Sequence, residues 1–193
     1  MKCVGMLYRT ALIVFTLGAI AAAQNPTDLS ARPISNEAVF ADFKDRVRGY
    51  TENRETIESD MPALSKQATA EAIAAHKAAL LKSVLAARKG AVRGQIFTPE
   101  AEKAIRTIIA THYSGRDSME LRKEVAEAEN KTVPVKVNAV YPEAAELLEM
   151  PAKLLLALPE LPKQVRYRFV GNNLLIVDRE NHLIVDYMTN ALP

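Results

Sequence analysis

Acidic residues and a histidine lie close together near the C-terminus, where they could bind a divalent cation. They are Asp178, Glu180, His182 and Asp186. Carboxylate oxygens and imidazole nitrogens are common ligands of divalent metals. The same residue types also suit β-turns and polar strand ends, and the glycine and distal glutamate of an EF-hand loop are missing. The sequence therefore supports two interpretations, a divalent metal site and ordinary turn chemistry.

A small basic patch precedes the sequence Gln-Ile-Phe in the middle of the chain. Its members, Arg88, Lys89 and Arg93, could receive a phosphate or an acidic partner, and they are the candidate partner-binding residues. Cations in the last turn of a helix also interact favourably with the helix dipole, which explains Arg88 and Lys89 without any ligand. The spacing Gly90-x-x-x-Gly94 is not a phosphate loop, because the following Lys-Ser/Thr is absent.

Motifs of catalysis are missing from the sequence. There is no G-x-S-x-G, H-E-x-x-H or S-x-x-K, and the histidines at positions 76, 112 and 182 are not spaced as metal ligands. We therefore expect neither a catalytic site nor a cofactor, with a divalent metal ion as the alternative. A small hydrolase whose site is assembled from distant residues stays a further alternative.

The first 23 residues have the pattern of a cleavable signal peptide. Lys2 and Arg9 precede an uncharged apolar run that ends in Ala21-Ala22-Ala23, which fits the A-x-A rule for cleavage before Gln24. The run is shorter than the about 20 apolar residues that span a bilayer, and no later run approaches that length. We therefore expect an exported protein, periplasmic or secreted, with no transmembrane segment after cleavage.

Cysteine and charge restrict the chemistry of the mature chain. The only cysteine, Cys3, lies in the signal, so disulfides and thiolate sites are excluded after cleavage. Removing Lys2 and Arg9 leaves 25 − 2 = 23 basic residues against 23 acidic ones. A net charge near zero gives no reason to expect nucleic acid as a partner.

The region 35–130 has helical periodicity, after a polar tether at 24–34. Phe43, Val47 and Tyr50 recur at three- and four-residue steps, and Arg54 interrupts this stripe. An alanine-rich segment that ends at Gly90 predicts a second helix, and the two helices suggest an antiparallel hairpin. Thr98-Pro99-Glu100 is typical of the start of a third helix, and a charged fourth helix is predicted to end near residue 130.

The region 131–193 changes to a β pattern. Val133, Val135 and Val137 alternate with polar residues or proline, which predicts an edge strand. A short helix is expected over 152–158. Alternation and turn residues then predict a meander of three strands at 165–170, 174–177 and 183–187. The predicted fold is α+β, with an N-terminal layer of three to four helices and a small C-terminal antiparallel β-meander. Whether the two regions share a core is left open.

Several stretches resemble a group of exported bacterial proteins that are usually left uncharacterised. These stretches are Gly94–Glu100, Tyr141-Pro142-Glu143 and Leu158–Pro162, together with Tyr167–Gly171 and the two Ile-Val-Asp strands. This resemblance implies no activity. The C-terminal part is also similar to the periplasmic nickel/cobalt homeostasis family, through an "LP" stretch that leads into tyrosine-containing strands, but that likeness brings no metal ligand with it.

The sequence as a whole favours a non-catalytic binding or interaction module of the cell envelope, with another envelope protein as the expected partner. The alternative is a periplasmic metal-binding or metal-homeostasis protein that uses the acidic residues of the C-terminal hairpin. The sequence does not indicate an oligomeric state.

Overall fold

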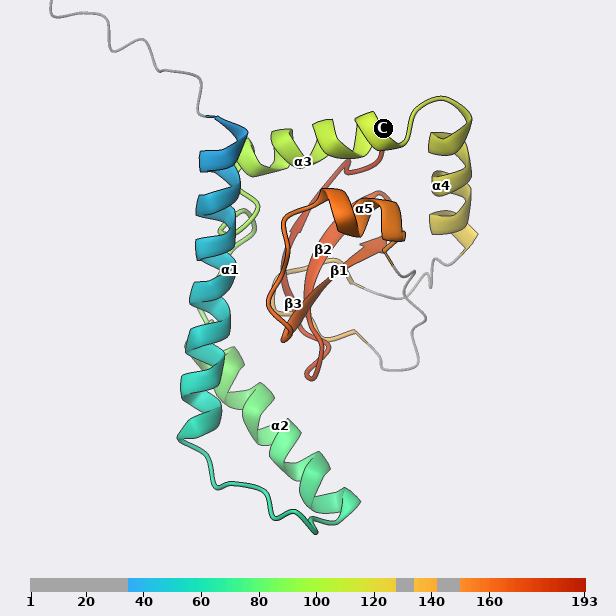
Figure 1. The fold of residues 1–193 in the computed structure, drawn as a ribbon. Helices are drawn as coiled ribbons and strands as arrows, with labels where there is room; N and C mark the ends of the chain where they lie inside the picture. Colours follow the sequence, from blue (N-terminus) through green and yellow to red (C-terminus); the bar gives the residue numbers. More distant parts are fainter. Residues whose placement is uncertain (1–34, 128–133, 142–149) are drawn as a thin grey trace, which may run out of the picture. The chain divides into compact units, whose positions relative to one another are not determined.

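A computed structural model describes residues 35–127, 134–141 and 150–193 (Figure 1). Helices fill the N-terminal part, and a fifth, short helix precedes the sheet: α1 (Asn36–Ser59), α2 (Ala70–Ala87), α3 (Pro99–His112), α4 (Arg116–Glu127) and α5 (Ala152–Ala157). The predicted signal peptide and tether, and the predicted end of the fourth helix, lie outside the described residues.

The first three helices begin where hydroxyl side chains can cap them. The side-chain oxygens of Ser35, Thr69 and Thr98 each accept a hydrogen bond from a backbone N–H three residues later, at 3.2–3.3 Å. These bonds satisfy donors that have no partner within the helix. Pro99 occupies the first turn of α3, where its missing N–H costs nothing.

The sheet is a meander of three antiparallel strands in the order β1-β2-β3. The strands are β1 (Val165–Val170), β2 (Asn173–Asp178) and β3 (Ile184–Met188). In the register, Tyr167 lies opposite Ile176, and Ile176 lies opposite Asp186. The ladder between β2 and β3 is irregular between Ile176 and Val177. The predicted α+β class, with helices first and a β-meander last, is confirmed.

One hydrophobic core joins the helices to the sheet. It contains Phe43 and Val47 of α1 and Ile105 of α3, together with Phe169 and Ile176 from the strands. The question that the sequence left open is therefore answered, since both regions contribute to one core. A smaller cluster covers the other face of the sheet, where Tyr141 packs with side chains of all three strands.

The helix pair α1 and α2 is packed along only part of its length. Leu80 and Val84 of α2 are buried, whereas Ile73 in its first turn is 40% exposed. The described helices include none that is both long enough and apolar enough to cross a membrane.

The edge strand predicted over 133–137 is wrong in its described part. Residues 134–136 have no regular structure, and the chain turns at 137–138, where Asn138 adopts a positive φ of 64°. Pro134 has no N–H to donate to a ladder. The chain meets the sheet just after this segment, where Val140 forms an isolated bridge to Leu183.

Candidate functional site

Asp178 lies at the centre of a buried polar cluster between β2 and α1. Its side chain is fully buried. Its Oδ2 accepts hydrogen bonds from the Tyr50 hydroxyl at 2.8 Å and from the Arg54 Nε at 3.0 Å. Its Oδ1 accepts the backbone N–H groups of Glu180 and Asn181 at 3.0 and 2.9 Å. Asp178 thus shapes the β2–β3 turn and ties the sheet to α1.

Asp186 fixes the chain between α2 and α3 to the sheet in a similar way. It is 1% exposed, and its carboxylate accepts the backbone N–H groups of Gly94, Ile96 and Phe97 at 2.9, 2.7 and 3.0 Å. A fourth bond comes from the N–H of Tyr187. Gly94 has a φ of +86°, a conformation that glycine adopts without steric cost. The repeated Leu-Ile-Val-Asp sequence therefore supplies two buried aspartates that hold the helical layer on the sheet.

The four predicted metal-binding residues are distributed among internal contacts. Glu180 forms an ion pair with Arg54, as Asp178 does, and His182 stacks on the ring of Tyr141 at 5.0 Å. No group of three or more acidic, histidine or cysteine side chains within the described residues is arranged to hold a metal ion. The metal site stays a prediction, and these contacts favour the alternative, turn and strand-end chemistry.

The candidate partner-binding arginines cover the outer edge of β3. Arg88 donates to the carbonyl of Val185 at 2.7 Å and to the side chain of Asn138 at 2.9 Å. Its guanidinium lies 5.0 Å from the centre of the Tyr50 ring. Burial lowers the pKa of Arg88, against the opposing effect of Tyr50 and Asp186.

Arg93 completes this cover, while Lys89 is exposed. Arg93 donates to the carbonyl of Tyr187 at 3.3 Å and pairs with Glu102 at 2.7 Å. Backbone hydrogen bonds also cover this edge. The N–H groups of Asn138 and Tyr141 donate to the carbonyls of Ile184 and His182. The outer side of β3 is thus largely occupied by the chain itself.

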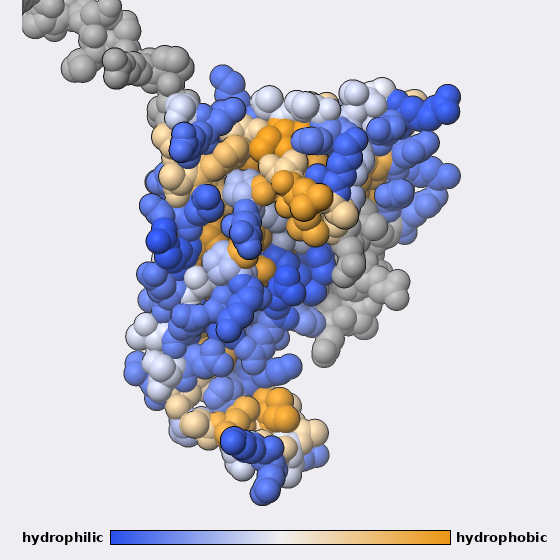
Figure 2. All heavy atoms as spheres, in the orientation of Figure 1, coloured by the Kyte–Doolittle hydropathy of each residue, from blue (hydrophilic) through white to orange (hydrophobic). Residues whose placement is uncertain are grey.

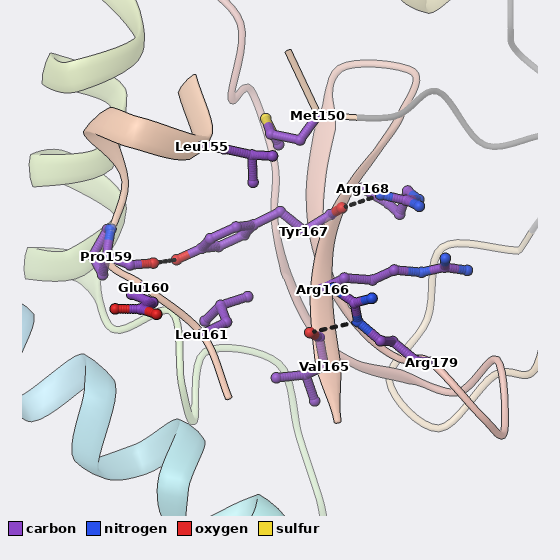
Figure 3. A pocket seen from close by; sticks show the side chains of 10 residues that line it. All are labelled: Met150, Leu155, Pro159, Glu160, Leu161, Val165, Arg166, Tyr167, Arg168 and Arg179. Carbon is purple, nitrogen blue, oxygen red and sulfur yellow. Dashed lines mark hydrogen bonds between the residues drawn. The ribbon is translucent and has the colours of Figure 1, made fainter. Parts of the chain in front are cut away.

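The opposite edge of the sheet borders a groove of about 330 Å³, here called the β1 groove (Figure 3). Apolar side chains, Tyr167 and Glu160 lie on one side of β1, and three arginines extend to the other side. The lining residues are Met150, Leu155, Pro159, Glu160, Leu161, Val165, Arg166, Tyr167, Arg168 and Arg179.

Three of the side chains that line the β1 groove are arginines, and one, Glu160, is acidic. Arg166 donates from Nη2 to the Tyr141 hydroxyl at 2.9 Å, and its Nε is buried without a hydrogen-bond partner among the described residues. Arg179 is exposed and donates to the carbonyl of Val165 at 3.3 Å. Arg168 donates to the carbonyl of Tyr167 at 3.0 Å.

Sequence reasoning did not identify the β1 groove. The signal was nevertheless present, because arginines alternate with Val165, Tyr167 and Phe169 along β1. Such alternation predicts a strand, and it also places both arginines of the strand on the same face. What the sequence could not show is that Arg179, from the β2–β3 turn, joins them.

Buried tyrosines are expected to make the protein sensitive to alkali. Burial and the neighbouring Asp178 raise the pKa of Tyr50 well above its usual range, and burial does the same for Tyr167. The unfolded chain releases these protons near pH ~10 while the folded chain retains them. Stability from the protonated tyrosines is therefore complete below about pH 10 and is lost as the pH rises further.

Urea denaturation between about pH 8 and pH 11 measures this effect. The free energy of unfolding should fall above about pH 10, and it should fall less steeply in the Tyr50→Phe, Tyr167→Phe double variant. Tyr187→Phe, which changes a half-buried side chain, is the matched control. An identical alkaline slope in the double variant and the wild type would contradict the prediction.

Comparisons with protein-family models, with curated proteins and with solved structures found no match. The resemblances to uncharacterised exported proteins and to the nickel/cobalt homeostasis family therefore stay predictions.

Proposed function

We propose that this chain is an exported, non-catalytic binding protein that holds its partner at the β1 groove. The observation that carries the proposal is the composition of that groove, which has an apolar wall and arginine side chains beside a strand edge. An apolar area on the surface over α5 continues this wall (Figure 2), where Leu155 is 51% and Leu156 is 90% exposed. Neighbouring exposed apolar side chains next to a groove are typical of interaction sites.

The absence of catalysis in this proposal rests on how the buried carboxylates are used. A general base needs a free lone pair within reach of a substrate proton. Asp178 and Asp186 each accept four hydrogen bonds from the protein itself. Neither residue lines the β1 groove. The groups that do line it, arginines and apolar side chains, are suited to binding.

Export predicts a defined N-terminus for the mature protein. Intact-mass measurement on protein recovered from its host should give a chain that begins at Gln24. Replacing Ala23 with arginine should block cleavage and leave the full precursor, since the last residue of the A-x-A pattern must be small. Ala22→Arg is the matched control, because the middle position of the pattern is unrestricted. Cleavage of the Ala23→Arg precursor at the same site would contradict the prediction.

Site-specific cross-linking tests the binding function. A photoreactive phenylalanine analogue placed at Leu156 of the full chain, in its own host, should give an adduct with one identifiable molecule. The Arg179→Glu substitution should abolish this adduct, and the same analogue at Lys82, on the exposed side of α2, should not form it. The proposal would be overturned by no adduct at Leu156, or by the same adduct from both positions.

A further inference from the structure

The outward side of β1 is defined by its hydrogen bonds. The N–H of Arg179 donates to the carbonyl of Gln164 at 2.9 Å, one residue before the strand begins. Backbone groups in an antiparallel pair alternate between facing the neighbour and facing away. The backbone of residues 166, 168 and 170 therefore faces β2, and that of Val165, Tyr167 and Phe169 faces outward.

Side chains of the protein itself occupy part of this outward edge. Arg179 and Arg168 donate to the outward carbonyls of Val165 and Tyr167, and the N–H of Val165 donates to Pro162. The carbonyls of β3 are covered in a similar way by Arg88 and Arg93. On β3, however, the described backbone of 138–141 adds direct hydrogen bonds, whereas β1 is paired within the described residues only with β2.

The two sides of the β1 groove differ in chemistry. Tyr167, Leu155 and Leu161 lie on the helical side, and Arg166, Arg168 and Arg179 lie on the opposite side (Figure 3). A strand added beside β1 would direct its side chains alternately to these two sides. One set would contact apolar side chains, and the other set would contact guanidinium groups.

We propose that the β1 groove takes an extended peptide strand in which apolar and acidic residues alternate. This inference rests on the proposed binding function and names the chemistry of its partner. The incoming strand donates its N–H groups to the outward carbonyls of β1 and accepts from the outward N–H groups of Tyr167 and Phe169. Its carboxylates pair with Arg179 and with Arg166, whose buried Nε has no described partner.

The guanidinium groups on the edge of β1 have one hydrogen-bond partner in the free protein and another in the peptide complex. In the free protein, Arg179 donates a hydrogen bond to the carbonyl of Val165. A charged side chain on a strand edge disfavours non-specific pairing with the strands of other chains. When the strand binds, its N–H replaces the guanidinium, which turns to a carboxylate of the peptide. A strand without acidic residues leaves the displaced arginine without a partner and is therefore rejected.

The probe is a labelled, capped peptide of six residues in which valine and glutamate alternate. Fluorescence anisotropy with the purified mature chain should show saturable binding with a Kd below about 1 mM. Two control peptides should not bind, one with lysine in place of glutamate and one with N-methyl groups on alternate backbone nitrogens. The first control tests charge, and the second tests backbone pairing.

Amide hydrogen exchange on the wild-type protein tests the location without a substitution. Saturating peptide should slow exchange at Tyr167 and Phe169 and leave exchange along α2 unchanged. Arg179→Glu should weaken binding about tenfold, and the charge-matched Lys82→Glu should leave the affinity unchanged. Because Arg179 is exposed, far-UV circular dichroism should show both variants folded.

Three results would overturn the inference: no binding up to about 1 mM, equal binding of the N-methylated peptide, or unchanged exchange at Tyr167 and Phe169. Equal binding of the N-methylated peptide would mean that the groove takes acidic ligands without strand pairing. These failures remain distinct from failure of the proposed function. A cross-link at Leu156 that depends on Arg179 would still identify a binding protein, with a partner of different shape.

Discussion

Replacing Asp178 with alanine is expected to lower the free energy of unfolding by about 3–5 kcal/mol. The substitution leaves Arg54, which is 4% exposed, without its buried counter-ion. It also removes the acceptor for the Tyr50 hydroxyl and for two N–H groups of the β2–β3 turn. Asp178→Asn should be nearly as damaging, because an amide has one acceptor oxygen and directs an NH₂ group at donors.

Urea denaturation of the purified protein, followed by far-UV circular dichroism, measures the loss. The matched control is Asp60→Ala, which removes an exposed carboxylate just after α1. A change of less than about 0.5 kcal/mol is expected there. An Asp178→Ala variant as stable as this control would contradict the assigned role.

A double variant separates the ion pair from the packing. Arg54→Met combined with Asp178→Leu replaces the buried charges with apolar side chains of similar size. Its loss of stability should be smaller than the sum of the two single losses, because each single change breaks the same Arg54–Asp178 pair and the double variant loses that pair only once. Strict additivity would show that the pair contributes nothing beyond its separate parts.

The contacts of Asp178 show which features could be predicted from the sequence and which could not. The turn after β2 could be predicted from the sequence, and Arg54 could be seen to interrupt the apolar stripe of α1. A charged residue at a core position of a helix predicts a buried partner. Yet Tyr50 and Arg54 are separated from Asp178 by 128 and 124 residues, so spacing along the chain could not connect them.

Helix starts and the meander could be predicted because their causes are local. Capping hydroxyls, Pro99 and the turn residues act within a few positions of the elements that they define. The strand predicted at 133–137 failed for the converse reason. Alternation of valines was present, but a strand also needs a neighbour along its length. The described residues 134–137 pair with no strand, and the chain meets the sheet only after them, at the bridge between Val140 and Leu183.

The candidate site was missed because its charge comes from two elements. The sequence directed attention to Arg88 and Arg93, whose clustering is visible along the chain. Those residues cover the edge of β3. Arg166 and Arg179 are far less conspicuous, and the geometry of a hairpin brings them together beside β1. Clustering in the sequence and clustering in space therefore select different arginines.

Replacing Asp186 should have the second large effect on the free energy of unfolding. The partners of this carboxylate are backbone N–H groups, whereas Asp178 pairs with an arginine. Asp186→Ala is expected to lower the free energy of unfolding by about 3 kcal/mol or more, because the N–H groups of Gly94, Ile96 and Phe97 lose their acceptor. Asp186→Asn should recover only part of this loss, since its NH₂ group faces the same donors. Urea denaturation gives the magnitude, and Asp45→Asn, on the exposed face of α1, is the matched control.

Amide exchange and added metal distinguish the two interpretations of Asp186. If the carboxylate holds the chain between α2 and α3, exchange at Ile96 and Phe97 accelerates in Asp186→Ala far more than exchange in the middle of α1. The stability of the wild type then does not respond to Zn²⁺ or Ni²⁺. If the C-terminal hairpin binds a metal, added Zn²⁺ or Ni²⁺ raises the unfolding temperature of the wild type and not of the variant. Because all four hydrogen bonds to Asp186 come from backbone N–H groups, we expect the first result.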